Sequence, residues 1–178
     1  MTKEELFCER ARDYRATVKL AANDNEIAAL VARFLQESRA LSCVVPPGLD
    51  TQWYAPAELA GVRILCDDPP LSYEVLDGTA AVLTAAAVGI AATGTLALDH
   101  RLDQGRRVIS LLPDTHICVV RAAQIVEDVP EALALLESSV LAKQPVTWIS
   151  GPSATVDIEL IRVEGVHGPR NLFVIVAR

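Results

Sequence analysis

The chain has 178 residues, a net charge of −7 and a pI near 4.9, and 51% of its residues are hydrophobic whereas only 4% are aromatic. This composition suits one domain with a large aliphatic core, and its acidic balance argues against a nucleic-acid surface, which needs clustered Lys and Arg. No apolar run is long enough to cross a bilayer and the charged N-terminus is unlike a signal peptide, so we expect a cytoplasmic protein without membrane insertion.

Residues 1–40 are predicted to be helical. Asn23, Asp24 and Asn25 have side chains that suit a helix N-cap, so a break into two helices is expected there. The second helix has apolar residues at helical spacing, namely Ile27, Leu30, Val31, Phe34 and Leu35. The first helix is poor in apolar residues, and we expect it to pack loosely or against a partner.

Short aliphatic runs bounded by turn residues predict strands in the rest of the chain. These runs are residues 41–45, 63–66, 95–98, 108–112, 116–120, 146–149 and 172–176. Helices are predicted to begin at Pro56 and near Asp128, because proline is tolerated in the first helical turn. The second of them would place Leu133, Leu136 and Val140 on one face. Residues 79–88 are alanine-rich and fit a strand or a helix equally.

Strands that alternate with helices indicate an α/β fold. We expect a three-layer-like sandwich with a mostly parallel or mixed sheet, because the strands between residues 95 and 120 have no obvious helix between them. The expected division of the chain is a helical segment at residues 1–40 and an α/β domain at residues 41–178.

The four cysteines are scattered, without a Cys-x-x-Cys pair, which is the wrong spacing for an iron–sulfur cluster or a structural zinc. We therefore expect neither a metal site nor a bound cofactor. Cys43, Cys66 and Cys118 each lie in an apolar run, which predicts buried free thiols.

Thr93-Gly94-Thr95 precedes one of the predicted strands. A glycine there lets the backbone pass close to a ligand, with two hydroxyls available to bond it. The same pattern also suits a tight entry into a strand, and the residues alone leave both alternatives open.

Arg106 and Arg107 follow a glycine and precede a predicted strand. Two such arginines can hold an anion, but exposed arginines are usually solvated, and we favour solvation here. His116 begins an apolar strand, where a histidine is usually a hydrogen-bonded structural residue unless the strand end faces a cleft.

The segment from Ser150 to Glu159 (SGPSATVDIE) concentrates turn formers, hydroxyls and carboxylates. Ser153 or Thr155 is predicted to cap a short helix, whose N-terminal N–H groups would suit an anion. Asp157 and Glu159 would then point about 200° apart, so they cannot act as a pair on one ligand.

His167 lies between Gly165 and Gly168-Pro169 in the sequence GVHGP. A histidine on a glycine-rich loop at a sheet edge is a candidate for acid/base chemistry or ligand contact. The sequence has no Gly-x-Ser-x-Gly nucleophile motif, no P-loop and no Gly-x-Gly-x-x-Gly fingerprint, which argues against the common hydrolase and nucleotide-binding folds.

Taken together, these stretches resemble the lactate-utilisation protein C family, which is defined by the LUD domain. The resemblance rests on GIAATGTLAL at residues 89–98, SLLPDTHICVV at 110–120, SGPSATVDIE at 150–159 and GVHGP at 165–169. It implies an α/β fold similar to the ribose-5-phosphate isomerase and CoA-transferase group, to which 5-formyltetrahydrofolate cyclo-ligase is related. It also implies a place beside iron–sulfur proteins that together oxidise L-lactate to pyruvate.

One position departs from that family, which usually has Glu-Thr-Gly-Thr where this chain has Ala92-Thr93-Gly94-Thr95. A methyl group neither accepts a hydrogen bond nor takes a proton, so Ala92 cannot serve as a catalytic carboxylate. Whether the chain is itself an enzyme therefore stays open at this point.

The leading hypothesis is a component of an L-lactate utilisation system that binds a small anionic ligand or a partner. The expected ligand-binding residues are Thr93, Gly94, Thr95, His116, Gly151, Pro152, Ser153, Asp157 and Gly168, and the catalytic candidates are His167 and Glu159. One alternative is a stand-alone isomerase, CoA-transferase or cyclo-ligase acting on a phosphorylated or acyl metabolite. Another is a non-catalytic scaffold that docks a partner through its first helix.

Overall fold

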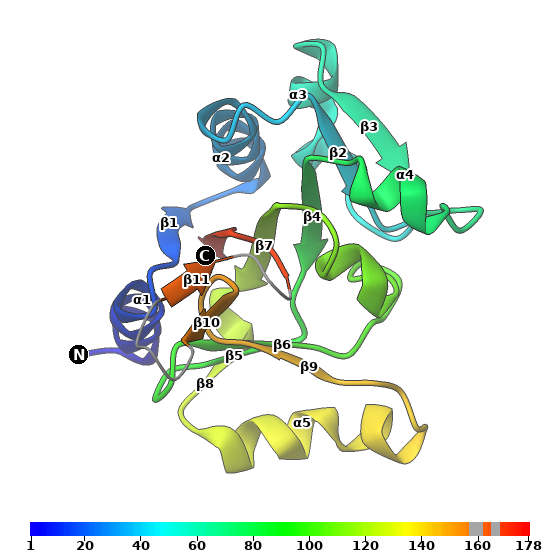
Figure 1. Cartoon of the computed structure of the whole chain (residues 1–178). Coiled ribbons are helices and arrows are strands. Elements are labelled where there is room, and N and C mark those ends of the chain that lie inside the picture. Colours follow the sequence, from blue (N-terminus) through cyan, green and yellow to red (C-terminus); the bar gives the residue numbers. More distant parts are fainter. Residues whose placement is uncertain (157–161, 165–167) are drawn as a thin grey trace.

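Six parallel strands form the centre of the fold in a computed structural model of the chain, which describes residues 1–156, 162–164 and 168–178 (Figure 1). Every pair of neighbouring strands in this sheet runs parallel. Their order across the sheet is β1 (Thr17–Ala21), β12 (Asn171–Ala177), β7 (Thr115–Arg121), β4 (Ala81–Ala85), β2 (Ser42–Val45) and β3 (Arg63–Cys66).

The inner strands are apolar on both faces because both faces of the sheet are covered. Along β7, Ile117 and Val119 face one hydrophobic cluster, whereas Cys118 and Val120 face another. This alternation follows from the two-residue period of a strand. The uninterrupted aliphatic runs of the sequence are thus a consequence of two-sided burial.

One face of the sheet is covered by α2 (Asp24–Glu37), with the 3₁₀ turn η1 (Thr51–Trp53) and α3 (Ala55–Leu59) beside it. The Asn23 side chain accepts a hydrogen bond from the Glu26 N–H at 3.0 Å and caps α2 as expected. Phe34 of α2 stacks on Phe173 of β12 with ring centroids 4.4 Å apart, which joins the helix to the sheet.

The other face is covered by α1 (Lys3–Asp13) and by a smaller mixed sheet. The strands of that sheet lie in the order β8 (Ile125–Val126), β5 (Val88–Ile90), β6 (Thr95–Leu98) and β9 (Thr147–Ile149). Helix α5 (Val129–Leu141) packs on this sheet through a third hydrophobic cluster, and Figure 1 shows it at the outer side of the molecule. The expected α/β fold is therefore confirmed, with an all-parallel main sheet.

The remaining described elements are connections. They are α4 (Tyr73–Asp77), the 3₁₀ turns η2 (Arg107–Ser110) and η3 (Ala122–Gln124), and the hairpin of β10 (Ala154–Val156) and β11 (Arg162–Glu164). No helix in the described part of the chain is long and apolar enough to span a membrane.

Two predicted elements are wrong. Residues 17–21, expected to be helical, form the edge strand β1, which has only Val18 and Ala21 buried and therefore lacks a strong apolar pattern. Residues 108–112, expected to be a strand, lie mostly in the 3₁₀ turn η2, where the Ser110 hydroxyl donates to the Arg107 carbonyl. The proposed boundary between residues 40 and 41 stays a prediction.

Three predicted environments are also wrong. Cys66 is exposed because its strand, β3, lies at the edge of the sheet, whereas Cys43 and Cys118 are buried as expected. Helix α5 buries Ala132, Leu136 and Ser139, so Leu133 and Val140 lie on its exposed side. Helix α1 buries Phe7 completely, together with Cys8 and Ala11, and is thus an integral part of the core.

Candidate functional site

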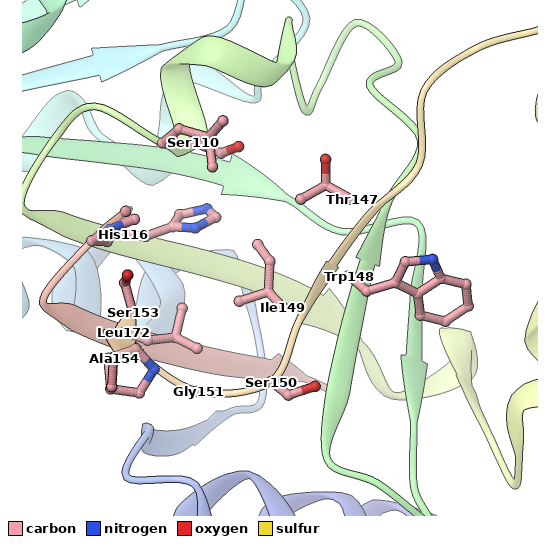
Figure 2. A pocket seen from close by; sticks show the side chains of 14 residues that line it. Ser110, His116, Thr147, Trp148, Ile149, Ser150, Gly151, Ser153, Ala154 and Leu172 are labelled. Atoms are coloured by element: carbon pink, nitrogen blue, oxygen red, sulfur yellow. The ribbon is translucent and has the colours of Figure 1, made fainter. Parts of the chain in front are cut away.

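A cavity of about 270 Å³ lies at the amino edge of the main sheet, where β7 and β12 begin (Figure 2). We call it the amino-edge cavity. Its walls come from the turn before β7, from the start of β7 and β12, from β9 and the loop that follows it, and from the turn before β12. The lining residues are Ser110, Leu111, His116, Thr147, Trp148, Ile149, Ser150, Gly151, Pro152, Ser153, Ala154, Gly168, Pro169 and Leu172.

Five of the residues expected from the sequence meet in this cavity, namely His116, Gly151, Pro152, Ser153 and Gly168. The backbone N–H of Ser153 donates to the Pro169 carbonyl at 2.8 Å, which joins the two loops that carry them. Gly168 lies against the Ser153 side chain, with room for an ordinary contact if it carried a methyl group. Loops far apart in the sequence therefore form one wall.

Thr93, Gly94 and Thr95 lie outside the lining but are connected to it. The Thr93 hydroxyl donates to the Thr95 hydroxyl at 2.8 Å, and Thr95 is 2.7 Å from the hydroxyl of Ser150, which does line the cavity. The chain of three hydroxyls fixes the loop after β9 against the start of β6. Thr93 and Thr95 thus support the cavity wall rather than form it.

Gly94 and Gly151 allow the close approach of α1 and of the residue that follows it. Both have positive φ values, 61° and 83°. A Cβ atom on Gly94 would overlap the backbone of Ala11, and one on Gly151 would overlap the carbonyl of Tyr14. The tight turn is observed at Gly94, and a ligand contact at this residue stays a prediction.

The helix expected to be capped by Ser153 or Thr155 does not begin within residues 154–156, which form strand β10. Residues 157–159, through which that helix was expected to run, lie outside the described residues, so an anion seat in this segment stays a prediction. Asp157, Glu159 and His167 lie outside the described residues, so their proposed roles stay predictions.

His116 is buried and hydrogen-bonded, with its Nε2 atom 2.8 Å from the Thr84 hydroxyl. The Thr84 hydroxyl donates to Cys118 Sγ at 3.7 Å, so the His116 proton belongs on Nε2. The other ring nitrogen, Nδ1, has no hydrogen-bond partner in the part of the chain that the structure describes. Burial lowers the pKa of His116 to about 4, so the ring is neutral near pH 7 and Nδ1 is an acceptor.

Thr147 is oriented by a second histidine. His100 Nδ1 is 2.9 Å from the Gly105 carbonyl, which can only accept, so Nδ1 carries the proton. His100 Nε2 must then accept from the Thr147 hydroxyl, 2.8 Å away. Burial lowers the pKa of His100, which favours this neutral form. The lone pairs of the Thr147 oxygen are left for a ligand.

No charged side chain occurs among the lining residues named above. The hydroxyl protons of Ser110 and Thr147 are committed to protein acceptors, and His116 Nδ1 carries a lone pair. In Figure 2, the Ser110, Thr147, His116 and Ser153 side chains surround the cavity. This lining best suits a small polar molecule that donates hydrogen bonds.

Ser110, Thr147 and Ser150 are site residues that sequence reasoning missed. Thr147 and Ser150 flank the short strand before Gly151, and a polar residue at each end of an apolar strand was the available signal. Ser110 was not predicted as a site residue because its segment, residues 108–112, was expected to be a strand.

The predicted solvation of Arg106 is wrong, because its guanidinium forms a bidentate ion pair with the buried Asp67 at 2.6 and 2.8 Å. Arg107 is exposed as predicted. Ala92 is also exposed, and its N–H donates to the Glu127 carbonyl at 2.9 Å. Neither arginine nor Ala92 belongs to the lining of the amino-edge cavity.

The sequence profile of the LUD domain matches residues 72–177. The chain therefore belongs to the LUD domain family, as its motifs indicated. It is 49% identical to the Lactate utilization protein C of Deinococcus radiodurans over 170 residues, which are 96% of this chain and 77% of that protein. Lactate utilization protein C of Bacillus subtilis is 36% identical over 91 residues, which are 49% of this chain and 38% of that protein.

A solved structure also matches over the whole chain. It is the crystal structure, at 1.70 Å resolution, of a DUF162 family protein from Deinococcus radiodurans, with a TM-score of 0.83 and 41% identity. The match covers 100% of this chain and 99% of that one, so the arrangement of both sheets is common to the two proteins.

Proposed function

We propose that this protein is a component of an L-lactate utilisation system, in which it works with iron–sulfur partner proteins that oxidise L-lactate to pyruvate. The observation that carries the proposal is the 49% identity, over almost the whole chain, to a protein named Lactate utilization protein C. The proposed role of the amino-edge cavity is to bind a small polar ligand of that system.

The positions of the cysteines support a division of labour between this chain and its partners. Cys43 and Cys118 lie in the core, and burial raises the pKa of both thiols to about 12, so neither forms the thiolate that binds iron. Cys8 is also buried, and Cys66 alone is exposed. The clusters of the proposed system would therefore be held by the partners.

The lining of the cavity bears on the nature of the ligand. A carboxylate such as that of lactate would have to be held by the Ser150 and Ser153 hydroxyls and by backbone N–H groups, without an ion pair to the lining residues. A hydroxyl of the ligand would donate to His116 Nδ1 or Thr147. The small anionic ligand expected from the sequence thus stays a prediction. A ligand that carries a hydroxyl donor fits the lining of the amino-edge cavity best.

Growth on L-lactate tests the proposal. Deletion of the gene is expected to abolish growth on L-lactate but not on glucose, and the wild-type chain carried on a plasmid is expected to restore it. The tagged chain is expected to co-purify with iron–sulfur proteins from cells grown on lactate. Normal growth of the deletion strain on lactate would show that the proposal is wrong.

Two substitutions test the role of the cavity within that system. Ser153→Ala removes a lining hydroxyl, and Gly168→Ala adds a methyl group that reaches the Ser153 side chain without a backbone clash. Both variants are expected to fold and to slow growth on lactate. Ser138→Ala, at an exposed position of α5, is the matched control and should grow normally. Full growth of both cavity variants would remove the cavity from the proposal.

The alternative of a stand-alone isomerase, CoA-transferase or cyclo-ligase relied on a phosphate or carboxylate seat at the helix expected after Gly151. Residues 154–156 form strand β10 instead of the start of that helix, so the described residues give this alternative no direct support. A thermal-shift screen of sugar phosphates, CoA esters and folates would revive it, if a compound raised the melting temperature of the wild type but not of Ser153→Ala.

A further inference from the structure

A second cavity, of about 170 Å³, lies at the opposite edge of the main sheet, where β2, β4 and β7 end. We call it the carboxyl-edge cavity. Its polar lining residues are Asp50, Trp53, Asp103, Arg121 and Gln124. None of them was singled out in the sequence, and none lines the amino-edge cavity.

The topology of the sheet places this cavity where parallel sheets usually bind ligands. From β2 the chain moves outward to β3 at the edge, and it then returns to β4 on the other side of β2 before it continues to β7 and β12 (Figure 1). The connections that leave β2 and β4 therefore diverge, and such a reversal opens a crevice outside the carboxyl ends of the strands.

Arg121, at the end of β7, provides the positive charge of the cavity. Its guanidinium carbon lies 5.9 Å from the ring centroid of Trp53, whose indole N–H donates to Asp24 at 2.9 Å and is thereby fixed. The Arg121 guanidinium has no ion pair or hydrogen bond within the described part of the chain. This cation–π contact places the guanidinium over the Trp53 ring and leaves its N–H groups able to bind a carboxylate in a bidentate manner.

Asp50 and Asp103 provide negative charge from the other connections. Asp50 Oδ1 accepts the Gln52 N–H at 2.9 Å. Asp103 is half-buried, and its carbonyl accepts the Ala85 N–H at 3.0 Å, so its loop is tied to the end of β4. The wall is also preformed at Gln124, whose amide is occupied by the Ala86 and Ala87 carbonyls and by the Arg121 N–H.

The size and the charges of the cavity limit its ligand. Its volume of about 170 Å³ equals that of roughly six water molecules, which suits a small metabolite better than a nucleotide or a CoA ester. One cation and two carboxylates complement a molecule that carries both a carboxylate and a positive group, whereas a simple anion would face an excess of negative charge.

We propose that the carboxyl-edge cavity binds a small α-amino acid zwitterion, with the ligand carboxylate on Arg121 and the ligand ammonium on Asp103 and Asp50. The site is separate from the amino-edge cavity, so it is independent of the function proposed above.

The two tryptophans of the chain make the test specific, because Trp53 lines the carboxyl-edge cavity and Trp148 lines the amino-edge cavity. Two-dimensional ¹H–¹⁵N spectra of the full chain separate the two indole N–H signals, and the Trp148→Phe variant assigns them. Titration with L-alanine is expected to move the Trp53 signal in a saturable manner and to leave the Trp148 signal in place.

Substitutions then connect the signal to the proposed contacts. Arg121→Gln is expected to weaken L-alanine binding at least tenfold, since a charge-assisted bidentate contact is lost, and Asp103→Asn is expected to weaken it as well. Arg33→Gln is the matched control, because Arg33 also lies over an aromatic ring, at 5.5 Å from the Phe34 centroid, but does not line this cavity. Its affinity for L-alanine should equal that of the wild type.

L-Lactate, which has a hydroxyl in place of the ammonium, is the matched ligand and is expected to bind at least tenfold more weakly at this site. The proposal is overturned if L-alanine leaves the Trp53 signal unchanged, if Arg121→Gln binds as well as the wild type, or if L-lactate moves the Trp53 signal with equal affinity.

Discussion

The guanidinium of Arg106 binds the buried carboxylate of Asp67 through two parallel hydrogen bonds, from Nε to Oδ2 at 2.6 Å and from Nη2 to Oδ1 at 2.8 Å. Nη2 also donates to the Leu71 carbonyl at 2.6 Å, and the Leu71 N–H donates to Asp67 Oδ1 at 2.9 Å. The pair therefore ties the connection after β3 to the turn that precedes β7. It is a structural contact rather than an anion site.

The two partners are expected to differ in the cost of their removal. Arg106→Met leaves the Asp67 carboxylate, which is 2% exposed, without its counter-charge, and should lower the free energy of unfolding by about 3 kcal/mol. Asp67→Ala leaves an arginine that is 36% exposed and can turn to water, so a loss of only about 1–2 kcal/mol is expected. Urea denaturation at pH 7 measures both values.

Arg107→Met is the control for that comparison, because Arg107 is the exposed neighbour in the same turn. It should change the free energy of unfolding by less than about 0.5 kcal/mol. Equal losses for Arg106→Met and Asp67→Ala would contradict the assigned asymmetry of burial.

Acid should destabilise the protein through His116. Its pKa is about 4 in the folded protein and near 6.5 when the ring is exposed, so the unfolded chain binds a proton first as the pH falls. The contribution of this group to stability is constant above about pH 6.5 and is lost between pH 6.5 and 4, by about 3 kcal/mol in total. The loss should be absent from His116→Gln, so the difference between the two pH profiles isolates it.

The pH profiles come from urea denaturation at a series of pH values between 7 and 4. All other ionisable groups are the same in both proteins, so their contributions cancel in the difference. If the free energy of unfolding changed with pH in the same way in the wild type and in His116→Gln, His116 would take up its proton equally in the folded and the unfolded chain, as a ring that faces water does.

The glycines of the two loops under α1 should not tolerate alanine. Gly94→Ala and Gly151→Ala each combine a positive φ with an overlap against α1 or the residue after it, and each should cost at least about 2 kcal/mol of stability. Gly61 has a φ of 96° but nothing within 4 Å of an added Cβ, so Gly61→Ala isolates the backbone strain, at about 1 kcal/mol. Thermal unfolding followed by circular dichroism ranks the three variants, and a Gly61→Ala loss as large as the other two would refute the packing argument.

Aliphatic runs predicted most strands of the main sheet, including the edge strand β3, whereas the alanine-rich inner strand β4 fits a strand or a helix by pattern. Strands β2, β7 and β12 lie inside the sheet, and two-sided burial demands the continuous aliphatic runs by which they were recognised. Strand β1 at the sheet edge buries only two residues and was taken for helix. The face of α5 was misjudged because its exposed side is itself apolar, with Leu133, Leu135 and Leu141 all about half exposed or more.

The candidate site was predictable to the extent that its loops carry turn residues. The Gly-Pro-Ser and Gly-Pro loops were both assigned to the expected ligand pocket, and both line the amino-edge cavity. The orientation of the Thr147 hydroxyl was not predictable, because it depends on His100, which only tertiary packing brings there, and that of Ser110 depends on a 3₁₀ turn in a segment predicted to be a strand. The carboxyl-edge cavity was not predicted either, because its polar residues come from three segments that only the fold brings together, namely those after β2, after β6 and at the end of β7.

The scaffold hypothesis assigns the docking of a partner to helix α1. Removal of residues 1–22, the simplest test of docking through this helix, would also delete β1 and expose the cluster around Phe7, so it cannot separate docking from folding. Phe7→Ala alone should lower the free energy of unfolding by about 3–5 kcal/mol, because the ring is fully buried. Glu9→Ala, on the exposed side of the same helix, should leave stability unchanged.

Docking is then tested by Glu9→Arg in pull-downs of the folded protein. Loss of a partner at unchanged melting temperature would support the scaffold role, and full retention of the partner would count against docking through this face of α1.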